Sequence, residues 1–379
     1  MLLCLTFISA TLLGSSPADS GRVHMPLTAP VTAPAADTLY TIGNDFSDRL
    51  IIPTDSLSSE SIVHNKLHHV STPDNVSHDT SKYIPQEQFT WAGRERFILD
   101  GSEPLRVTQI KPATLYGLEG TYLGVLVALH IYQENTFWRQ STSFRVRDNW
   151  DESLGANYGG HFVAGYFVSY ISTEFLLASG VSTKLAPIYG SLMGLGYQTY
   201  VEVLDGYGID FELSPYETYA QTLGVVYYLA SQYSPLLQNF IPKFNYYPSA
   251  WYHQLPKNGS QTPIDDYSAW NFWMSVNIPN LTGGALKPVW PDWLHLAVGY
   301  GARNLGDPGE SRIVTLALDY DLVKLLPDGS PTWNWFKQTL NFFKFPSPTI
   351  EWRFSRDGWK NMGTRFYLLY PFQIGNISF

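Results

Sequence analysis

Ionisable and amide-bearing side chains are sparse in a largely apolar stretch that runs from Asn157 to Gly224. A chain does not bury such groups without a partner or a purpose, because their removal from water is costly. An imidazole that faces one or two carboxylates can act as an acid and a base, or can bind a metal ion. The side chains of the stretch that could carry chemistry include His161, Glu174, Gln198, Glu202, Asp205, Glu217 and Gln221.

The spacing of these residues puts several of them on shared helix faces. Gln198, Glu202 and Asp205 stand at i, i+4 and i+7, so a helix presents all three on one side. We expect His161, on the preceding helix, to meet Glu202 in a cleft. No catalytic residue is assigned outright, and the candidates are His161, Glu202 and Asp205. Candidate ligand-binding side chains are Tyr170, Glu174, Gln198 and Gln221.

Each candidate also has a structural interpretation. A buried hydrogen-bond network can fix helix packing without any chemistry, which is the alternative for His161 and Glu202. Asp205 is followed by glycine, and an Asp-Gly pair after a helix is ordinary turn chemistry. Glu217 follows Ser214 by three residues in the pattern of a capping box, which accounts for it without a chemical role.

Composition favours a protein with much buried or membrane-adjacent surface. Charged residues make up 15% of the 379-residue chain, against a usual value of about 25%. The chain also contains 12 Trp, 25 Tyr and 21 Phe, and Trp and Tyr favour lipid–water interfaces. A large aromatic core in a soluble protein is the alternative. The net charge of −9 argues against a nucleic-acid partner, and the single cysteine, Cys4, excludes a disulfide framework.

The chain divides into four parts by composition. Residues 1–20 contain an apolar run like the central region of a secretory signal, although a basic N-terminal region is missing. Residues 21–82 are rich in Ser, Thr, Pro, Asp and His, which predicts a disordered tether. Residues 83–240 predict a helical domain, and residues 241–379 predict an antiparallel β region packed with it.

Apolar segments in the helical domain predict a four-helix bundle. The second and third helices are about 20 residues long, which is enough to span a hydrocarbon core. Glycines at 190 and 194 predict that helices two and three pack closely through small residues. The expected helices cover residues 116–138, 160–178, 183–204 and 214–232.

Period-two alternation with aromatic and β-branched residues predicts five strands after Pro242. In the strand at 312–322, Val314, Leu316, Leu318, Tyr320 and Leu322 face one way and Thr315, Ala317, Asp319 and Asp321 the other, as in a half-buried strand. An amphipathic helix at 330–345 either covers the sheet or lies on a membrane, with Lys337 and Lys344 extended towards water. The fold class is therefore α+β. The expected strands are 268–278, 293–302, 312–322, 347–355 and 364–372.

The order of three short motifs resembles a known family. Gly160-His161-Phe162 is followed by the ExLDG sequence at 202–206, and then by Ser214 through Gly224. This order is similar to that of the YfiM-like domain of unknown function, described as predicted periplasmic lipoproteins, and more distantly to the VanZ-like membrane proteins. The likeness extends over about 155–355 and implies a place in the bacterial cell envelope, in the periplasm or at the outer membrane.

The chain departs from that family where charge is concerned. Asn157-Tyr158 stands where typical members have an Asp-Lys pair, and Glu217 and Gln221 stand where Asp and Asn are usual. These departures favour a retained binding or scaffold role over an activity that needs the lost charges.

We therefore expect a non-catalytic, membrane-associated envelope protein that binds a lipid or another envelope component near His161. No cofactor is predicted, and protein partners stay open. An enzyme that acts on a lipid-linked envelope substrate, with His161 as base and Glu202 orienting it, is the alternative. A metal ion at the same residues is a third interpretation.

Overall fold

The computed structural model describes residues 82–370 without Phe137, 148–150, Asp210, 248–265 and Asp307, together with 373–374 and 377–378. The expected signal segment at 1–20 lies outside the described residues. So does the expected tether at 21–82, apart from its last residue. The described part is α+β, as expected from the sequence.

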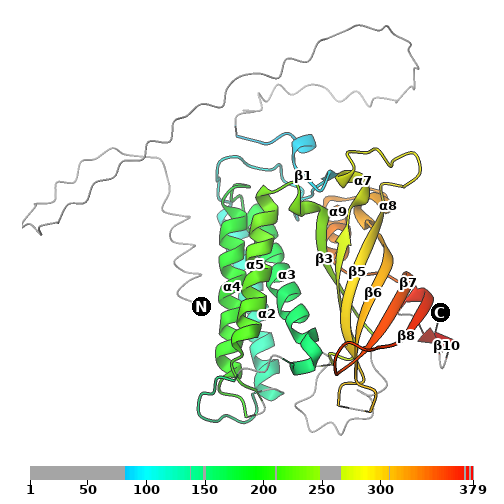
Figure 1. Cartoon of the computed structure of the whole chain (residues 1–379). Helices are drawn as coiled ribbons and strands as arrows, with labels where there is room; N and C mark the ends of the chain where they lie inside the picture. The colour runs from blue at the N-terminus through cyan, green and yellow to red at the C-terminus, as the bar shows by residue number, and fades with distance from the viewer. Residues whose placement is uncertain are drawn as a thin grey trace, which may run out of the picture. The chain divides into compact units, whose positions relative to one another are not determined.

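The long helices begin and end within four residues of the predicted positions. Each starts at or beside a residue that suits a helix start, and α5 has Ser214 as its N-cap, whose hydroxyl accepts a hydrogen bond from the Glu217 amide. Figure 1 shows these helices running alongside one another. Their bounds are α2 Pro112–Asn135, α3 Ala156–Ala178, α4 Ala186–Asp205 and α5 Pro215–Tyr233.

Helix α3 is the centre of the helical layer. It packs along α4 and α5 over most of its length, and small residues set the close approach. A Cβ at Gly190 would lie 2.6 Å from the backbone nitrogen of Thr173, and one at Gly194 would lie 2.5 Å from Ser169 Oγ. The predicted packing of these two helices through small residues is confirmed.

Helix α2 is less closely attached than a four-helix bundle would require. Tyr122 and Leu126 pack against Phe175 and Met193, but most of its surface is exposed. The structure thus establishes three tightly packed helices with α2 alongside, and the four-helix bundle is not confirmed. Among the described helices, α2 is also the one that is long and apolar enough to cross a membrane, whereas the sequence had suggested α3 and α4.

Six antiparallel strands form one sheet in the order β3-β4-β5-β6-β7-β8. Strand β3 was not predicted, because Pro242 interrupts its alternating pattern. A proline is tolerated there because β3 is an edge strand of the sheet. Short pairs β1 (Thr90–Trp91) with β2 (Arg94–Glu95), and β9 (Gln373–Ile374) with β10 (Ile377–Ser378), lie outside it. The six strands are β3 Phe240–Tyr246, β4 Trp270–Val276, β5 Leu294–Arg303, β6 Ser311–Tyr320, β7 Ser347–Ser355 and β8 Asn361–Tyr370.

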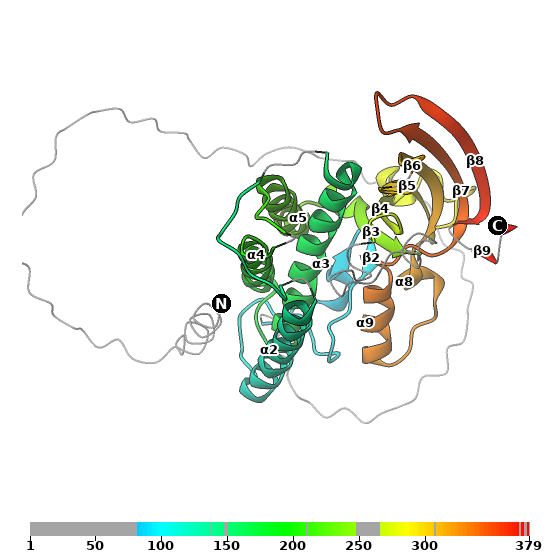
Figure 2. The same cartoon turned by 90° about the horizontal axis from the view of Figure 1, so that it is seen from below.

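The sheet is strongly curled. β4 and β8 are four strand spacings apart, about 19 Å in a flat sheet. Yet the Tyr370 hydroxyl of β8 donates a hydrogen bond to Asn271 of β4 at 3.1 Å. Figure 2 shows the strands arranged in an arc. The curl therefore encloses an inner face and leaves an outer one.

The inner face carries the sheet's buried polar and charged groups beside a small apolar cluster around Trp273, and the outer face is apolar. In β6, Thr315 and Asp319 are buried, whereas Leu316 of the opposite row is 38% exposed. Lys243 of β3 reaches across the inner face to Asp319, with 2.7 Å between Nζ and Oδ2. Burial alone would raise the pKa of Asp319, but Lys243 and Lys344 hold it below its ordinary value. The half-buried strand predicted at 312–322 is present, and the polar row is the one that it buries.

Lys337 and Lys344 do not extend towards water. The Lys337 ammonium donates to the carbonyl of Val323 and pairs with Asp328, and Lys344 donates to Ser347 Oγ at 2.7 Å. Both side chains are buried, so the expected extension towards water is wrong. The reason is that the sheet and its connections supply oxygen partners inside the protein.

Three short α-helices of the described part lie between strands of the sheet along the chain. Helix α3, rather than α9, packs on the strands. The most extensive contacts of α9 are with α8. Helix α3 contacts β3, β4 and β5, and Phe167 meets Phe244 of β3 with ring centroids 5.9 Å apart. The outer face of the later strands is left exposed. The short helices are α7 Ile278–Leu281, α8 Leu322–Leu325 and α9 Pro331–Leu340.

Close helix packing yields a matched pair of substitutions. Gly190→Ala places a methyl group against the Thr173 backbone, and we expect it to lower the free energy of unfolding by about 1–3 kcal/mol. Gly196→Ala, in the same helix, meets open space and should raise that free energy by about 0.5–1 kcal/mol. Denaturant unfolding of both variants checks the prediction. Equal effects would contradict the assigned helix contact.

Candidate functional site

The first part of α3 is anchored to the sheet and carries His161. Gly155 precedes the helix with a φ of +80°, a conformation that glycine adopts freely. The Tyr300 hydroxyl of β5 donates to the carbonyl of Leu154. Gly159 leaves no room beside Phe272 of β4, since a Cβ there would lie 2.7 Å from that ring. These contacts fix the direction in which the second turn of α3 points.

A tight connection brings the end of α4 to the beginning of α5. Arg145 holds it, because one guanidinium nitrogen donates to the carbonyls of Gly208 at 2.9 Å and Phe211 at 3.0 Å. Glu202 lies in the last turn of α4, and Glu217 lies in the first turn of α5. The connection therefore places two carboxylates from different helices beside α3.

His161 stands between these two carboxylates. Its Nδ1 lies 3.3 Å from Glu202 Oε1, and its Nε2 lies 3.5 Å from Glu217 Oε2. The amide of the buried Asn157 donates to the other oxygen of Glu217 at 2.8 Å. The expected meeting of His161 with Glu202 is confirmed.

Glu217 has a second role besides its place at the helix start. Its backbone amide donates to Ser214 Oγ at 3.4 Å, so the predicted cap is present. Its carboxylate, however, faces His161 and Asn157. The capping pattern in the sequence therefore concealed a site residue. The position of Glu217 one turn before Gln221 was the available clue.

Burial decides the protonation of the cluster. Burial, helped by the nearby Glu217 and Asp205, raises the pKa of Glu202 to about 9. Burial also raises the pKa of Glu217 and lowers that of His161 to about 4. A neutral imidazole thus faces a carboxyl group that keeps its proton at neutral pH. Such an arrangement can exchange protons, and it can also offer nitrogen and oxygen ligands to a cation.

Several buried polar atoms around His161 have no well-formed hydrogen bond. Neither carboxylate oxygen of Glu202 has one, although only 2% of that side chain is exposed. The same holds for Oδ1 of Asn157, and for both amide atoms of the fully buried Gln221, although Gln221 lies close enough to His161 to oppose the lowering of its pKa. Gln198, one turn before Glu202, also has an unpartnered amide nitrogen. Most buried polar groups in proteins are paired, so this concentration calls for a cause.

Asp205 is held by a different partner. Trp138 Nε1 donates to its Oδ1 at 2.7 Å, near the end of α4. Burial raises the pKa of Asp205 to about 7. The i, i+4, i+7 spacing is thus correct as helix geometry, but Asp205 is not among the side chains that meet the imidazole.

Tyr170 and Glu174 lie elsewhere. Thirteen residues separate Glu174 from His161 along α3, a rise of about 20 Å. Arg96 binds the Glu174 carboxylate at 2.6 Å, and Gln338 donates to the Tyr170 hydroxyl at 3.1 Å. The sequence analysis did not identify Arg96, although two arginines among the aromatic residues at 89–97 were an available signal.

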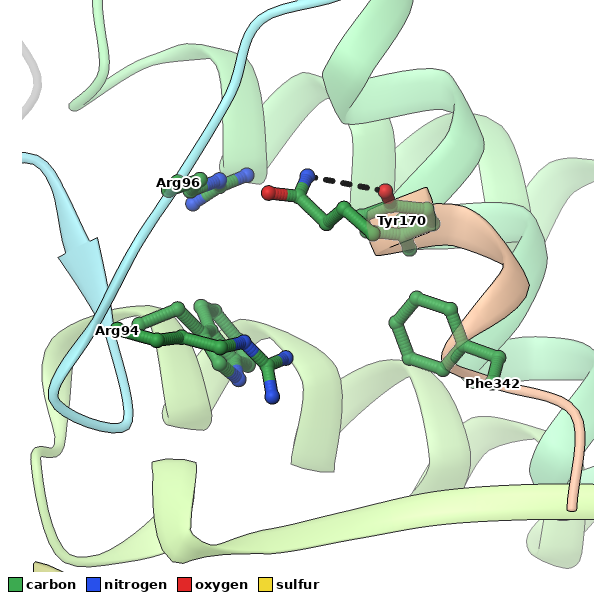
Figure 3. Close-up of a pocket in the computed structure, with 6 residues that line it drawn as sticks. Arg94, Arg96, Tyr170 and Phe342 are labelled. Atoms are coloured by element: carbon green, nitrogen blue, oxygen red, sulfur yellow. Dashed lines mark hydrogen bonds between the residues drawn. The ribbon is translucent and has the colours of Figure 1, made fainter. Parts of the chain in front are cut away.

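Arg96, Tyr170 and Gln338 help to line a small cavity. Its volume is about 10 Å³, room for one water molecule at most. Figure 3 shows Arg94 and Arg96 on one side of it, opposite Tyr170 and Phe342. Arg94 is also paired, with Asp321 at 3.1 Å. Because both guanidinium groups already have carboxylate partners, this second cluster serves to join the β1–β2 hairpin to the helices and the sheet.

The pKa of Asp205 predicts a dependence of stability on pH. Because it rises from an ordinary 3.8 to about 7 on folding, the folded protein binds a proton that the unfolded chain has released. Stability from this group is therefore present below about pH 4 and decreases as the pH rises to 7. Asp205→Asn keeps an acceptor for Trp138 and removes the titration. The melting temperature of Asp205→Asn minus that of the natural protein should be larger at pH 7 than at pH 4. A difference that does not change with pH would contradict the prediction.

Comparison of the chain with protein-family models, with curated proteins and with solved structures found no significant match.

Proposed function

We propose that the protein is a non-catalytic component of the bacterial cell envelope that lies against a lipid bilayer and binds a lipid or another envelope component. The observation that carries this proposal is the reversed polarity of the sheet. Charged groups occupy its inner face, while its outer face is apolar.

The reversal is difficult to reconcile with water on the outer face. Val298 and Phe366 on that face are 51% and 69% exposed, and Leu368 is exposed beside them. In water, large apolar side chains gain by facing inwards, and charged ones gain by facing outwards. Lipid chains remove the penalty on the outer side, since they are as apolar as these residues. The paired charges inside need no water because they have one another.

The helices also expose large apolar side chains, as the outer face of the sheet does. Val125 and Ile131 of α2 are exposed, as are Leu192 of α4 and Leu223 of α5. Contacts between α3 and its neighbours are made through glycine, serine and threonine, as is typical of helix pairs in membranes. The resemblance to the YfiM-like family, which implies an envelope location, agrees with this proposal.

Flotation with vesicles tests the lipid contact. Full-length protein, freed from detergent, should float with vesicles of phosphatidylethanolamine and phosphatidylglycerol, and lipids brominated in the acyl chain should quench its tryptophan fluorescence. Leu316→Glu with Phe366→Glu should weaken binding on the order of a hundredfold, because each side chain contributes about 1.5 kcal/mol or more on burial.

Leu325→Glu is the matched control, since Leu325 is an exposed leucine of α8 rather than of the outer face. It should float like the natural protein. A natural protein that stays monomeric without detergent, does not float and copurifies with no lipid by mass spectrometry would exclude the proposed function.

A second function is favoured by the placement of His161 between two carboxylates. An enzyme that acts on a lipid-linked envelope substrate could use the imidazole as base, with Glu202 orienting it through Nδ1. His161→Ala should then fold and bind vesicles normally but fail to restore growth or envelope integrity to a deletion strain. Full restoration by a folded His161→Ala protein would exclude the enzyme.

A further inference from the structure

Three helices each bring one side chain of a type that can bind a metal ion to the same point. His161, Glu202 and Glu217 come from α3, α4 and α5, and one ligand atom of each lies within 4.8 Å of the others. Residues so far apart in the sequence meet only because the helices pack closely and the α4–α5 connection is tight. The cluster is therefore a product of the fold.

The donor set suits a divalent transition-metal ion. Imidazole nitrogen and carboxylate oxygen both bind Zn²⁺ at about 2.0–2.2 Å, so two ligands of one ion lie at most about 4.4 Å apart. The distance of 3.5 Å between His161 Nε2 and Glu217 Oε2 already falls within this limit. A nitrogen and carboxylate set of this kind also suits Fe²⁺, Co²⁺ and Mn²⁺.

The two ends of α3 differ in whether a basic side chain accompanies the carboxylates. Glu174, at the other end of α3, has Arg96 as its cation. Within the described part of the chain, Glu202 has no Lys or Arg partner, and its carboxylate faces the imidazole of His161 without a well-formed hydrogen bond. The Glu174 cluster also leaves one carboxylate oxygen without a hydrogen bond, but its charge is paired. The His161 cluster has no such cation among the described residues.

The two ring nitrogens of His161 face different carboxylates and can therefore have different roles at a metal site. Nδ1 faces Glu202, whose side chain is almost fully buried, whereas Nε2 faces Glu217, whose side chain is 14% exposed. Metal-binding histidines usually donate the N–H of the second nitrogen to a carboxylate, which fixes the ring. Water ligands could reach an ion only on the side of Glu217. Asn157, which donates to that carboxylate, would hold it in place.

We propose that His161, Glu202 and Glu217 form a site for one divalent transition-metal ion, in which His161 Nε2 and Glu217 bind the ion and Glu202 fixes the imidazole through Nδ1. This site stands apart from the proposed contact with lipid, because the two depend on different residues. An ion there would compensate the Glu217 carboxylate and, through His161 and its contact with Glu202, tie α3, α4 and α5 together at one end.

Metal binding can be measured on the full-length protein prepared without a histidine tag. With Zn²⁺ alone as the probe, calorimetry should give one ion per chain, and the ion should raise the melting temperature. Co²⁺ should give visible absorption bands that respond to its ligands. His161→Ala and Glu217→Gln should abolish both signals. Glu202→Gln should weaken binding about 10–100-fold, as loss of the carboxylate behind a ligating histidine does elsewhere.

Asp205→Asn is the matched control, because it removes a carboxylate of the same helix that is bonded to Trp138. It should bind Zn²⁺ and Co²⁺ like the natural protein. Should His161→Ala fail to fold, Glu217→Gln carries the test, since that side chain is partly exposed and its amide can still pair with Asn157. Zn²⁺ binding that is absent from the natural protein, or that persists in Glu217→Gln, overturns the proposal; persistence would place the ion at other residues, such as the histidines at 64–78.

Discussion

The ion pair between Lys243 and Asp319 is the interaction on which the architecture depends. It joins β3 to β6 across the inner face, and Ser275 and Lys344 approach the same carboxylate. Removing one partner of such a buried pair leaves an uncompensated charge, typically at a cost of about 3–5 kcal/mol. The curl of the sheet is therefore held by groups that need one another. Since strands alternate their side chains, a polar inner row leaves the apolar row outside.

Helix α3 connects two clusters of opposite character. At one end, Glu174 is paired with Arg96, so its carboxylate has a cation beside it, although its Oε2 has no hydrogen bond. At the other end, His161 meets Glu202 and Glu217, and the buried oxygens of Glu202 are left without well-formed partners. The same helix thus shows what a charge-paired polar cluster looks like in this protein. The contrast is what separates the candidate site from a packing network.

Sequence patterns predicted the elements better than their surroundings. Apolar periodicity located α2 to α5, and the i, i+4 relation of Gln198 to Glu202 placed both on the buried side of α4. It could not show that Asp205 turns to Trp138, because that contact depends on a residue 67 positions away. Period-two alternation likewise predicted β6. The pattern alone does not show which of the two rows of side chains is buried, because that depends on how the rest of the protein packs around the sheet. Lys337 was misjudged for the same reason, since its carbonyl partner at Val323 comes from another helix.

The position of the ionisable groups along α3 is consistent with the proposed lipid contact. His161 lies in the second turn and Glu174 in the last two turns, whereas the middle of the helix is aromatic or small, with Tyr166, Phe167 and Ser169. A protein covered by lipid along its sides can keep charge only where a partner, water or an ion compensates it. Arg96 is the partner at one end. At the other end, Glu217 is partly exposed, so water or a cation can reach the imidazole from its side. On the proposed lipid-facing protein, one constraint would favour both the apolar outer surface and the location of the reactive groups at the helix ends.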